Sequence, residues 1–366
     1  MRTRTYLTEN QDDMGTAGTK TYNLDFTDPI SEIDLLFEAT NGATSNKNNP
    51  IEANISKIEI VDGGSVLWDL PGDVALAYWS HLKQSLAQAY RSGVASDAVC
   101  QPISIRFGRD LYDPELAFNP NAHKNPQLKV TFDEATIRAA GATGFVSDSF
   151  NLSIMVKLME NAASPSGFLS CREVHTFTSL ASGETKVELP TDRMIRTLIV
   201  RVYESGIDPS TDITRYRLSC DGGKFIPFDL YYRNLRDYMS EYFKPVLVPQ
   251  YTVTNNAEAH ETWIADGFAE FIRAHSAQHI VGAGSHAGGQ LTVSIYTDAG
   301  VGVDGSAVHF GVVGLPFHQT YIYPFGRLNE MTEWFDARAF NKADLFLTNG
   351  GAGAEVNVAV QQLYTY

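Results

Sequence analysis

Apolar and polar residues alternate along much of the chain, and this pattern predicts β-strands. Residues 19–27 read TKTYNLDFT and residues 55–61 read ISKIEIV, so every second side chain faces one side. Such a strand has one buried face and one exposed face. Comparable strand-like runs are predicted at 30–40, 99–107, 128–132, 149–159, 169–178, 186–189, 194–203, 213–220, 278–281, 291–296, 308–313, 318–323, 344–348 and 355–363.

Two segments change to a helical period. In residues 74–90, VALAYWSHLKQSLAQAY, apolar side chains recur at steps of three and four residues, which predicts an amphipathic helix. Asp73 is placed to cap its first turn. Residues 229–243, DLYYRNLRDYMSEYF, predict a second helix.

The two helices belong to a longer internal repeat. A strand, an Asp-Gly-Gly turn, an aromatic-Asp-Leu strand and a helix occur in this order in both halves. The tripeptide Trp68-Asp69-Leu70 corresponds to Phe228-Asp229-Leu230. The offset of roughly 160 residues is a typical domain length, and an Asp-Gly turn between apolar runs favours a hairpin.

This repeat predicts an all-β chain with two similar domains. We expect two tandem eight-stranded antiparallel jelly-roll β-barrels, each with a flanking helix. Residues 1–18 are polar and predict a flexible N-terminal arm. The first barrel is expected at 19–160 and the second at 168–366, separated by the small, polar stretch NAASPSG at 161–167.

Charge and cysteine content exclude several classes of protein. The net charge of −15 disfavours a broad nucleic-acid surface, because phosphate neutralisation needs clustered Lys and Arg, so we expect no direct sequence-specific nucleic-acid binding. Cys100, Cys171 and Cys220 form no CxxC pair, which predicts free thiols. No apolar run predicts a signal peptide or a membrane-spanning helix.

Catalytic patterns are missing as well. The sequence has no GxxxxGK[ST] phosphate loop and no GxSxG nucleophile elbow. HETWI, which begins at His260, lacks the second histidine of a zinc protease motif. His275 and His279 have a spacing that could bind a metal on a helix, but we interpret them, with His286, as loop histidines. We therefore expect no catalytic residue, cofactor or metal, and no enzyme.

The chain resembles the double jelly-roll major capsid proteins of tailless icosahedral viruses, which usually contain a membrane. The resemblance is carried by ISKIEIVDGGSVLWDL at 55–70 with its helix, by ITRYRLSCDGGKFIPFDLYYRNLRDYM at 213–239, and by FLTNGGAGAEVNVAVQQL at 346–363. It implies homotrimers of pseudo-hexagonal outline, upright barrels, and loops that form outward towers. Implied partners are neighbouring capsomers, minor capsid or penton proteins and an internal viral membrane. The implied location is the virion, after assembly in the host cytoplasm.

Within this interpretation, two sets of residues are candidates for contacts. Arg2 and Arg4 of the arm are expected at the inner face of the shell, near a neighbouring capsomer or anionic lipid. Deleting residues 1–18 would then leave soluble trimers but impair assembly. The helix residues expected to cover a barrel flank or to contact other subunits are Trp79, Leu82, Leu235 and Met239.

Two other functions remain open from the sequence. A carbohydrate-binding tandem β-sandwich would use exposed aromatic side chains, for which Trp263 and Trp334 are candidates. A cupin-like metalloenzyme would need clustered His and Glu with an HxH pair, and the sequence has none.

Overall fold

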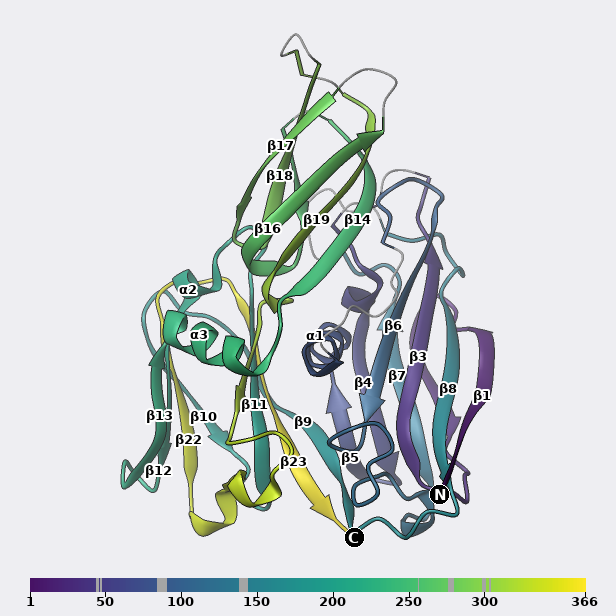
Figure 1. The fold of residues 1–366 in the computed structure, drawn as a ribbon, viewed down its shortest axis with the longest axis vertical. Helices are drawn as coiled ribbons and strands as arrows, with labels where there is room; N and C mark the ends of the chain where they lie inside the picture. The colour runs from purple at the N-terminus through teal and green to yellow at the C-terminus, as the bar shows by residue number, and fades with distance from the viewer. Residues whose placement is uncertain are drawn as a thin grey trace.

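The structure is a computed structural model that describes residues 1–43, 46, 48–83, 91–137, 144–255, 257–275, 280–297, 301–302 and 304–366. Two β-barrels stand side by side, and a smaller β-structure extends from one of them (Figure 1). Both chain termini lie at the opposite end of the molecule from this extension (Figure 1).

The first barrel is built from two four-stranded antiparallel sheets, with strand orders β1-β8-β3-β6 and β2-β7-β4-β5. Eight strands connected in this way form a jelly roll. The elements are β1 (Arg2–Asp13), β2 (Ala17–Asn23), β3 (Ile30–Thr40), η1 (Ile51–Asn54), β4 (Ile55–Asp62), β5 (Ser65–Leu70), α1 (Gly72–Lys83), β6 (Ala98–Arg106), η2 (Pro120–Ala122), β7 (Pro126–Asp133) and β8 (Asn151–Glu160), where η marks a 3₁₀ helix.

The second barrel repeats this topology. Its sheets have the orders β20-β11-β23-β9 and β10-β22-β12-β13, so each strand has the same neighbours as its counterpart in the first barrel. The expected pair of eight-stranded jelly rolls with flanking helices is confirmed. The elements are β9 (Gly167–Thr178), β10 (Gly183–Leu189), β11 (Met194–Tyr203), α2 (Pro209–Asp212), β12 (Ile213–Cys220), β13 (Phe225–Tyr231), α3 (Tyr232–Tyr242), β20 (Thr320–Pro324), η3 (Met331–Glu333), β21 (Phe335–Asp336), η4 (Ala337–Ala339), β22 (Ala343–Asn349) and β23 (Glu355–Thr365).

The repeat found in the sequence occupies equivalent places in the two barrels. It forms β4, β5 and α1 in the first barrel and β12, β13 and α3 in the second. Gly63 in the first turn has φ +59°, and Gly222 in the second has φ +69°. Glycine adopts this left-handed conformation without the steric cost that a Cβ brings, which explains the Asp-Gly-Gly sequence.

An insertion between α3 and β20 forms the extension seen at the top of Figure 1. The strand-like runs 291–296 and 308–313, expected in the second barrel, instead belong to two separate sheets, β15-β18-β17 and β14-β19-β16. The strands are β14 (Val246–Thr254), β15 (Glu258–Glu261), β16 (Ile264–His275), β17 (Ile280–Ala287), β18 (Gln290–Thr297) and β19 (Ser306–Phe317).

The N-terminal segment differs from the flexible arm that its polarity predicted. Residues 2–13 form β1, which pairs with β8 from Arg2 opposite Glu160 to Asp13 opposite Asn151. β1 is the edge strand of its sheet and is mostly exposed, so it needs no alternating apolar face. Backbone hydrogen bonds between β1 and β8, rather than burial of side chains, hold this segment in place.

The core explains why β11 is almost wholly buried. Leu198 and Val200 point into the core of the second barrel, while Ile199 belongs to the cluster that fills the first barrel. β11 is therefore buried on both faces, between its own barrel and the first one. The interface between the barrels therefore belongs to the same hydrophobic cluster as the interior of the first barrel.

Deleting residues 2–13 should destabilise the first barrel. β8 would lose its strand partner, and the Tyr22 hydroxyl would lose the Asp12 carboxylate to which it donates at 2.8 Å. Each lost hydrogen bond costs about 1 kcal/mol net, so the Tm should fall by about 5 °C or more in calorimetry. The double variant Arg2→Ala/Arg4→Ala is the control and should keep the native Tm. An unchanged Tm of the deletion would contradict the placement of β1.

Candidate functional site

Helix α1 lies between the two barrels (Figure 1). Residues 72–81 of this helix are all buried. The Tyr78 hydroxyl donates to Gln361 Oε1 at 2.6 Å and lies 3.1 Å from Thr197 Oγ1, both in the second barrel. The helix that belongs to the first barrel is thus also a packing surface for the second.

A buried ion pair fixes this contact. Asp73 at the start of α1 lies 2.9 Å from Arg201 Nη2 on β11, and each side chain is only 2% exposed. Arg201 also donates to Asn357 Oδ1 at 3.2 Å, and its guanidinium lies over the ring of Tyr203. Replacing Arg201 would take this cation away from the buried Asp73 carboxylate, which is strongly unfavourable. The pair therefore sets the orientation of α1 on the second barrel.

A second polar cluster joins the first barrel to the end of the insertion. His318 Nε2 lies 2.8 Å from Glu52 Oε1, and Arg91 forms an ion pair with the same carboxylate while its guanidinium lies over Trp263. Burial raises the pKa of Glu52, but the charge of Arg91 and the hydrogen bond from His318 outweigh it and lower the pKa to about 2. Because ionised Glu52 can only accept, His318 donates through Nε2.

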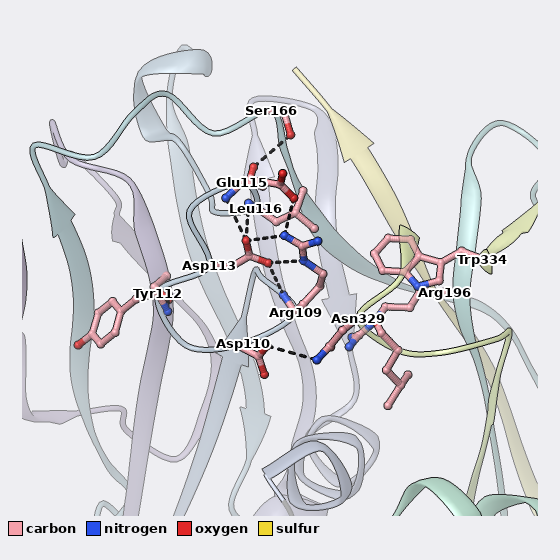
Figure 2. A network of polar contacts seen from close by, with 12 residues as sticks. Arg109, Asp110, Tyr112, Asp113, Glu115, Leu116, Ser166, Arg196, Asn329 and Trp334 are labelled. Carbon is pink, nitrogen blue, oxygen red and sulfur yellow. Dashed lines mark hydrogen bonds and ion pairs between the residues drawn. The ribbon is translucent and has the colours of Figure 1, made fainter. Parts of the chain in front are cut away.

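A third set of contacts lies nearer the chain termini (Figure 2). The Arg109 guanidinium donates to Asp113 through Nε at 2.7 Å and through Nη2 at 2.9 Å, which shapes the loop after β6. From this loop Asp110 accepts a hydrogen bond from Asn329 of the second barrel at 3.4 Å. An apolar cluster beside these contacts consists of Leu116, Leu169 and Trp334. The barrels are therefore joined by several separate sets of contacts.

The four predicted helix residues lie in these packed regions. Trp79 is 2% exposed and has the Arg106 guanidinium 4.6 Å from its ring centroid. Leu235 and Met239 of α3 are buried, and Leu82 is partly buried. All four thus lie in helices that flank a barrel, and a role in contacts between subunits stays a prediction.

Arg2 and Arg4 lie on β1 rather than on a free arm. Both are exposed, and Arg4 Nε forms a 3.1 Å ion pair with Glu160 on the neighbouring strand. Their expected contact with an inner surface stays a prediction.

The aromatic residues considered for carbohydrate binding are not exposed. Trp263 is 5% and Trp334 is 4% exposed. Arg91 lies over the first ring and Arg196 over the second. The prediction that these rings form an open sugar platform is wrong, because both are covered where separate parts of the chain meet.

The histidines and cysteines form no recognisable site in the described part of the chain. Among the described residues, no group of three His, Cys, Asp or Glu side chains is placed to hold a metal ion, and no helix is long and apolar enough to cross a membrane. His279 and the side chains of His275 and His286 lie outside the described part. The three cysteines are free thiols, and Cys171 and Cys220 are buried.

The sequence analysis missed the residues that join the barrels. Arg196 and Arg201 lie in MIRTLIVRVY, an apolar run too continuous for a strand with one exposed face. Charged residues in such a run need buried partners, and this signal could have identified them. Glu52 and His318 carry no comparable local signal, because they meet across 266 residues of sequence.

Two jelly rolls of the same strand order in one chain define a double jelly-roll protein. No family model and no curated protein matches the chain, but solved structures do. A chain from the atomic structure of Sulfolobus Turreted Icosahedral Virus is similar at 11% identity and a TM-score of 0.60, over 100% of this chain and 91% of that one.

Other virus proteins share the fold over the whole chain. The major capsid protein P2 from bacteriophage PM2 is similar at 10% identity and a TM-score of 0.57, covering 100% of this chain and 98% of that one. PBCV-1 VP54 is similar at 9% identity and a TM-score of 0.56, covering 99% and 93%. The chain therefore has the double jelly-roll fold found in these proteins.

Breaking the Asp73–Arg201 pair should destabilise the protein strongly. In Arg201→Met, the buried Asp73 carboxylate loses its cation, and we expect a loss of about 3–5 kcal/mol in urea unfolding. Arg215→Met is the control, since Arg215 pairs with Asp229 at 2.6 Å on the surface, where a salt bridge contributes little. Equal losses in both variants would contradict a structural role for the buried pair.

Asp69 should make the stability fall as the pH rises. Burial raises its pKa from the ordinary 3.8 to about 6, despite the Lys57 amine at 3.8 Å. Between these pH values the folded protein keeps a proton that the unfolded chain has released, so stability decreases from about pH 4 to pH 6. Asp69→Asn should make this decrease shallower and gain up to about 3 kcal/mol at pH 7. Asp212 keeps its own contribution, because burial raises its pKa to about 6 as well.

The control for this experiment is the residue at the same place in the second repeat. A hydrogen bond from Arg215 lowers the pKa of Asp229, so the effect of Asp229 has the opposite sign. Asp229→Asn should therefore keep the decrease between pH 4 and pH 6 in urea unfolding. A flat profile in the native protein would show that Asp69 is not buried as described.

Proposed function

We propose that this chain is the major capsid protein of an icosahedral virus and assembles as a homotrimer of pseudo-hexagonal outline. The observation that carries the proposal is the same jelly roll built twice, side by side, in one chain. The similarity to virus capsid proteins over the full length supports it. The proposed role is structural, without an enzymatic activity.

The geometry explains why a chain with two barrels suits a shell. Homo-oligomers favour closed symmetry, and three copies of a subunit with two lobes give a ring of six similar lobes. A six-lobed unit packs into flat facets, so one protein can cover a large surface. In this proposal the stretch 161–167 divides the two lobes, and β1 belongs to the first lobe.

The position of the insertion suggests the orientation in the shell. It extends at the end opposite both termini and would form the outward tower (Figure 1). The end with the termini would then face inward, which places Arg2 near neighbouring capsomers, minor capsid or penton proteins, or an anionic lipid surface. In this proposal the protein assembles in the host cytoplasm and is located in the virion.

The purified protein should be a trimer. Size-exclusion chromatography with light scattering should give three times the chain mass, and negative-stain images should show a hexagonal outline. A stable monomer at micromolar concentration, or a ring with another number of subunits, would contradict the proposal.

A further inference from the structure

The glycine-rich loop 350–353 packs very closely on α2, at the end of the second barrel from which the insertion extends (Figure 1). Gly350 and Gly351 do not adopt the left-handed backbone conformation that favours glycine. A different constraint acts on Gly351, because a Cβ there would lie 2.7 Å from Asp212 Oδ1 and 3.2 Å from Thr211 O. Glycine is therefore needed to keep the space beside these two oxygens free of a side chain.

Two carboxyl groups meet beside this loop. Asp212 belongs to α2 and Glu204 follows β11, and their carboxyl groups lie within hydrogen-bonding reach of each other. A Cβ on Gly353 would lie 3.2 Å from Glu204 Oε1, so the loop borders both groups. Asp212 is only 2% exposed, and its Oδ2 has no hydrogen-bond donor within the described part of the chain.

The electrostatics of this pair require a positive charge. The pKa of Asp212 rises to about 6 because the group is buried, and the charges of Glu204 and Asp208 act in the same direction. At neutral pH the carboxylate is nevertheless ionised, and a buried negative charge needs a cation or hydrogen-bond donors. Neither Glu204 nor Asp212 forms an ion pair with any residue that the structure describes.

We propose that Glu204 and Asp212 bind a divalent cation of the Ca²⁺ type, with the carbonyl oxygen of Thr211 as a further ligand. All the donors at this place are oxygens, which hard cations prefer. Only two carboxylates meet here, and Ca²⁺ combines carboxylates with main-chain carbonyls and water in one coordination shell. A cavity lined by Gly206, Asp208 and Thr211 lies beside the pair and provides a path from solvent.

The site joins three segments that are separate in the sequence: the end of β11, α2 and the loop between β22 and β23. It also lies next to the place where the chain returns from the insertion. There the Glu204 N–H donates to Gln319 Oε1 at 3.3 Å, just before β20. A bound cation would therefore stabilise the second barrel at the base of the insertion. All these ligands belong to one chain, so the inference does not depend on the proposed trimer.

Isothermal titration calorimetry with CaCl₂ tests the site on the full chain after treatment with EDTA. We expect one specific Ca²⁺ per chain. Asp212→Asn and Glu204→Gln should each raise the dissociation constant by about tenfold or more, because each removes charge from the ligand set. Asp69→Asn is the matched control, since Asp69 is also a buried carboxyl group with a pKa of about 6 but lies in the first barrel. It should bind Ca²⁺ as the native protein does.

A glycine substitution tests the geometry while both carboxylates stay in place. In Gly351→Ala, the new methyl group enters the space beside Asp212 Oδ1 and should weaken Ca²⁺ binding by about tenfold as well. Gly64→Ala is its control, because a Cβ on Gly64 meets no atom within 4 Å and its backbone is not left-handed. The Tm of each variant without Ca²⁺ shows whether the chain is folded.

The Tm of the native protein should rise more with Ca²⁺ than with the same concentration of Mg²⁺. A ligand that binds only the folded state stabilises it, and Mg²⁺ demands a stricter octahedral geometry. An equal rise with both ions would overturn the inference, because screening of the net charge of −15 would then explain it. Native affinity in both Asp212→Asn and Glu204→Gln, or no binding at about 10 mM Ca²⁺, would also overturn it. None of these results would affect the capsid proposal.

Discussion

The burial of α1 between the two barrels is the constraint on which the rest of the structure depends. A helix that packs on its own barrel with one side and on a second barrel with the other fixes the angle between them. Tyr78 and Asp73 hold it there through Gln361 and Arg201. The buried Asp73–Arg201 ion pair stabilises the interface less than apolar groups of the same shape could. It is satisfied in few relative orientations of α1 and the second barrel. The two barrels are thus held in one relative orientation.

The barrels could be predicted from the sequence because both copies of the repeat show the same pattern of buried positions and the same turn. Ile58 and Leu218 hold corresponding positions and are buried in the cores of the two barrels. The two Asp-Gly-Gly turns need the same backbone conformation. β1 was missed since an edge strand ordered by hydrogen bonds needs no apolar period. The insertion was misplaced because alternation predicts a strand without revealing its partner, so β18 and β19 resembled barrel strands.

The contacts between the barrels were less predictable for a related reason. The stripe that includes Trp79 and Leu82 correctly indicated a packed helix side, but a helix period cannot show that the opposite side is covered too. Trp263 appeared suited to an open surface, yet Arg91 covers it. Such contacts join residues far apart in the chain. Only charges inside an apolar run, such as Arg201 in β11, reveal them beforehand.

The two helices differ in sequence because the outer side of α1 is buried and the outer side of α3 is exposed. The outer side of α1 packs on the second barrel, so it can be apolar, as in VALAYWS. The outer side of α3 faces solvent, where a large exposed apolar patch would cause aggregation. This helix therefore keeps Leu235 and Met239 inside and carries Arg233 and Asp237 outside.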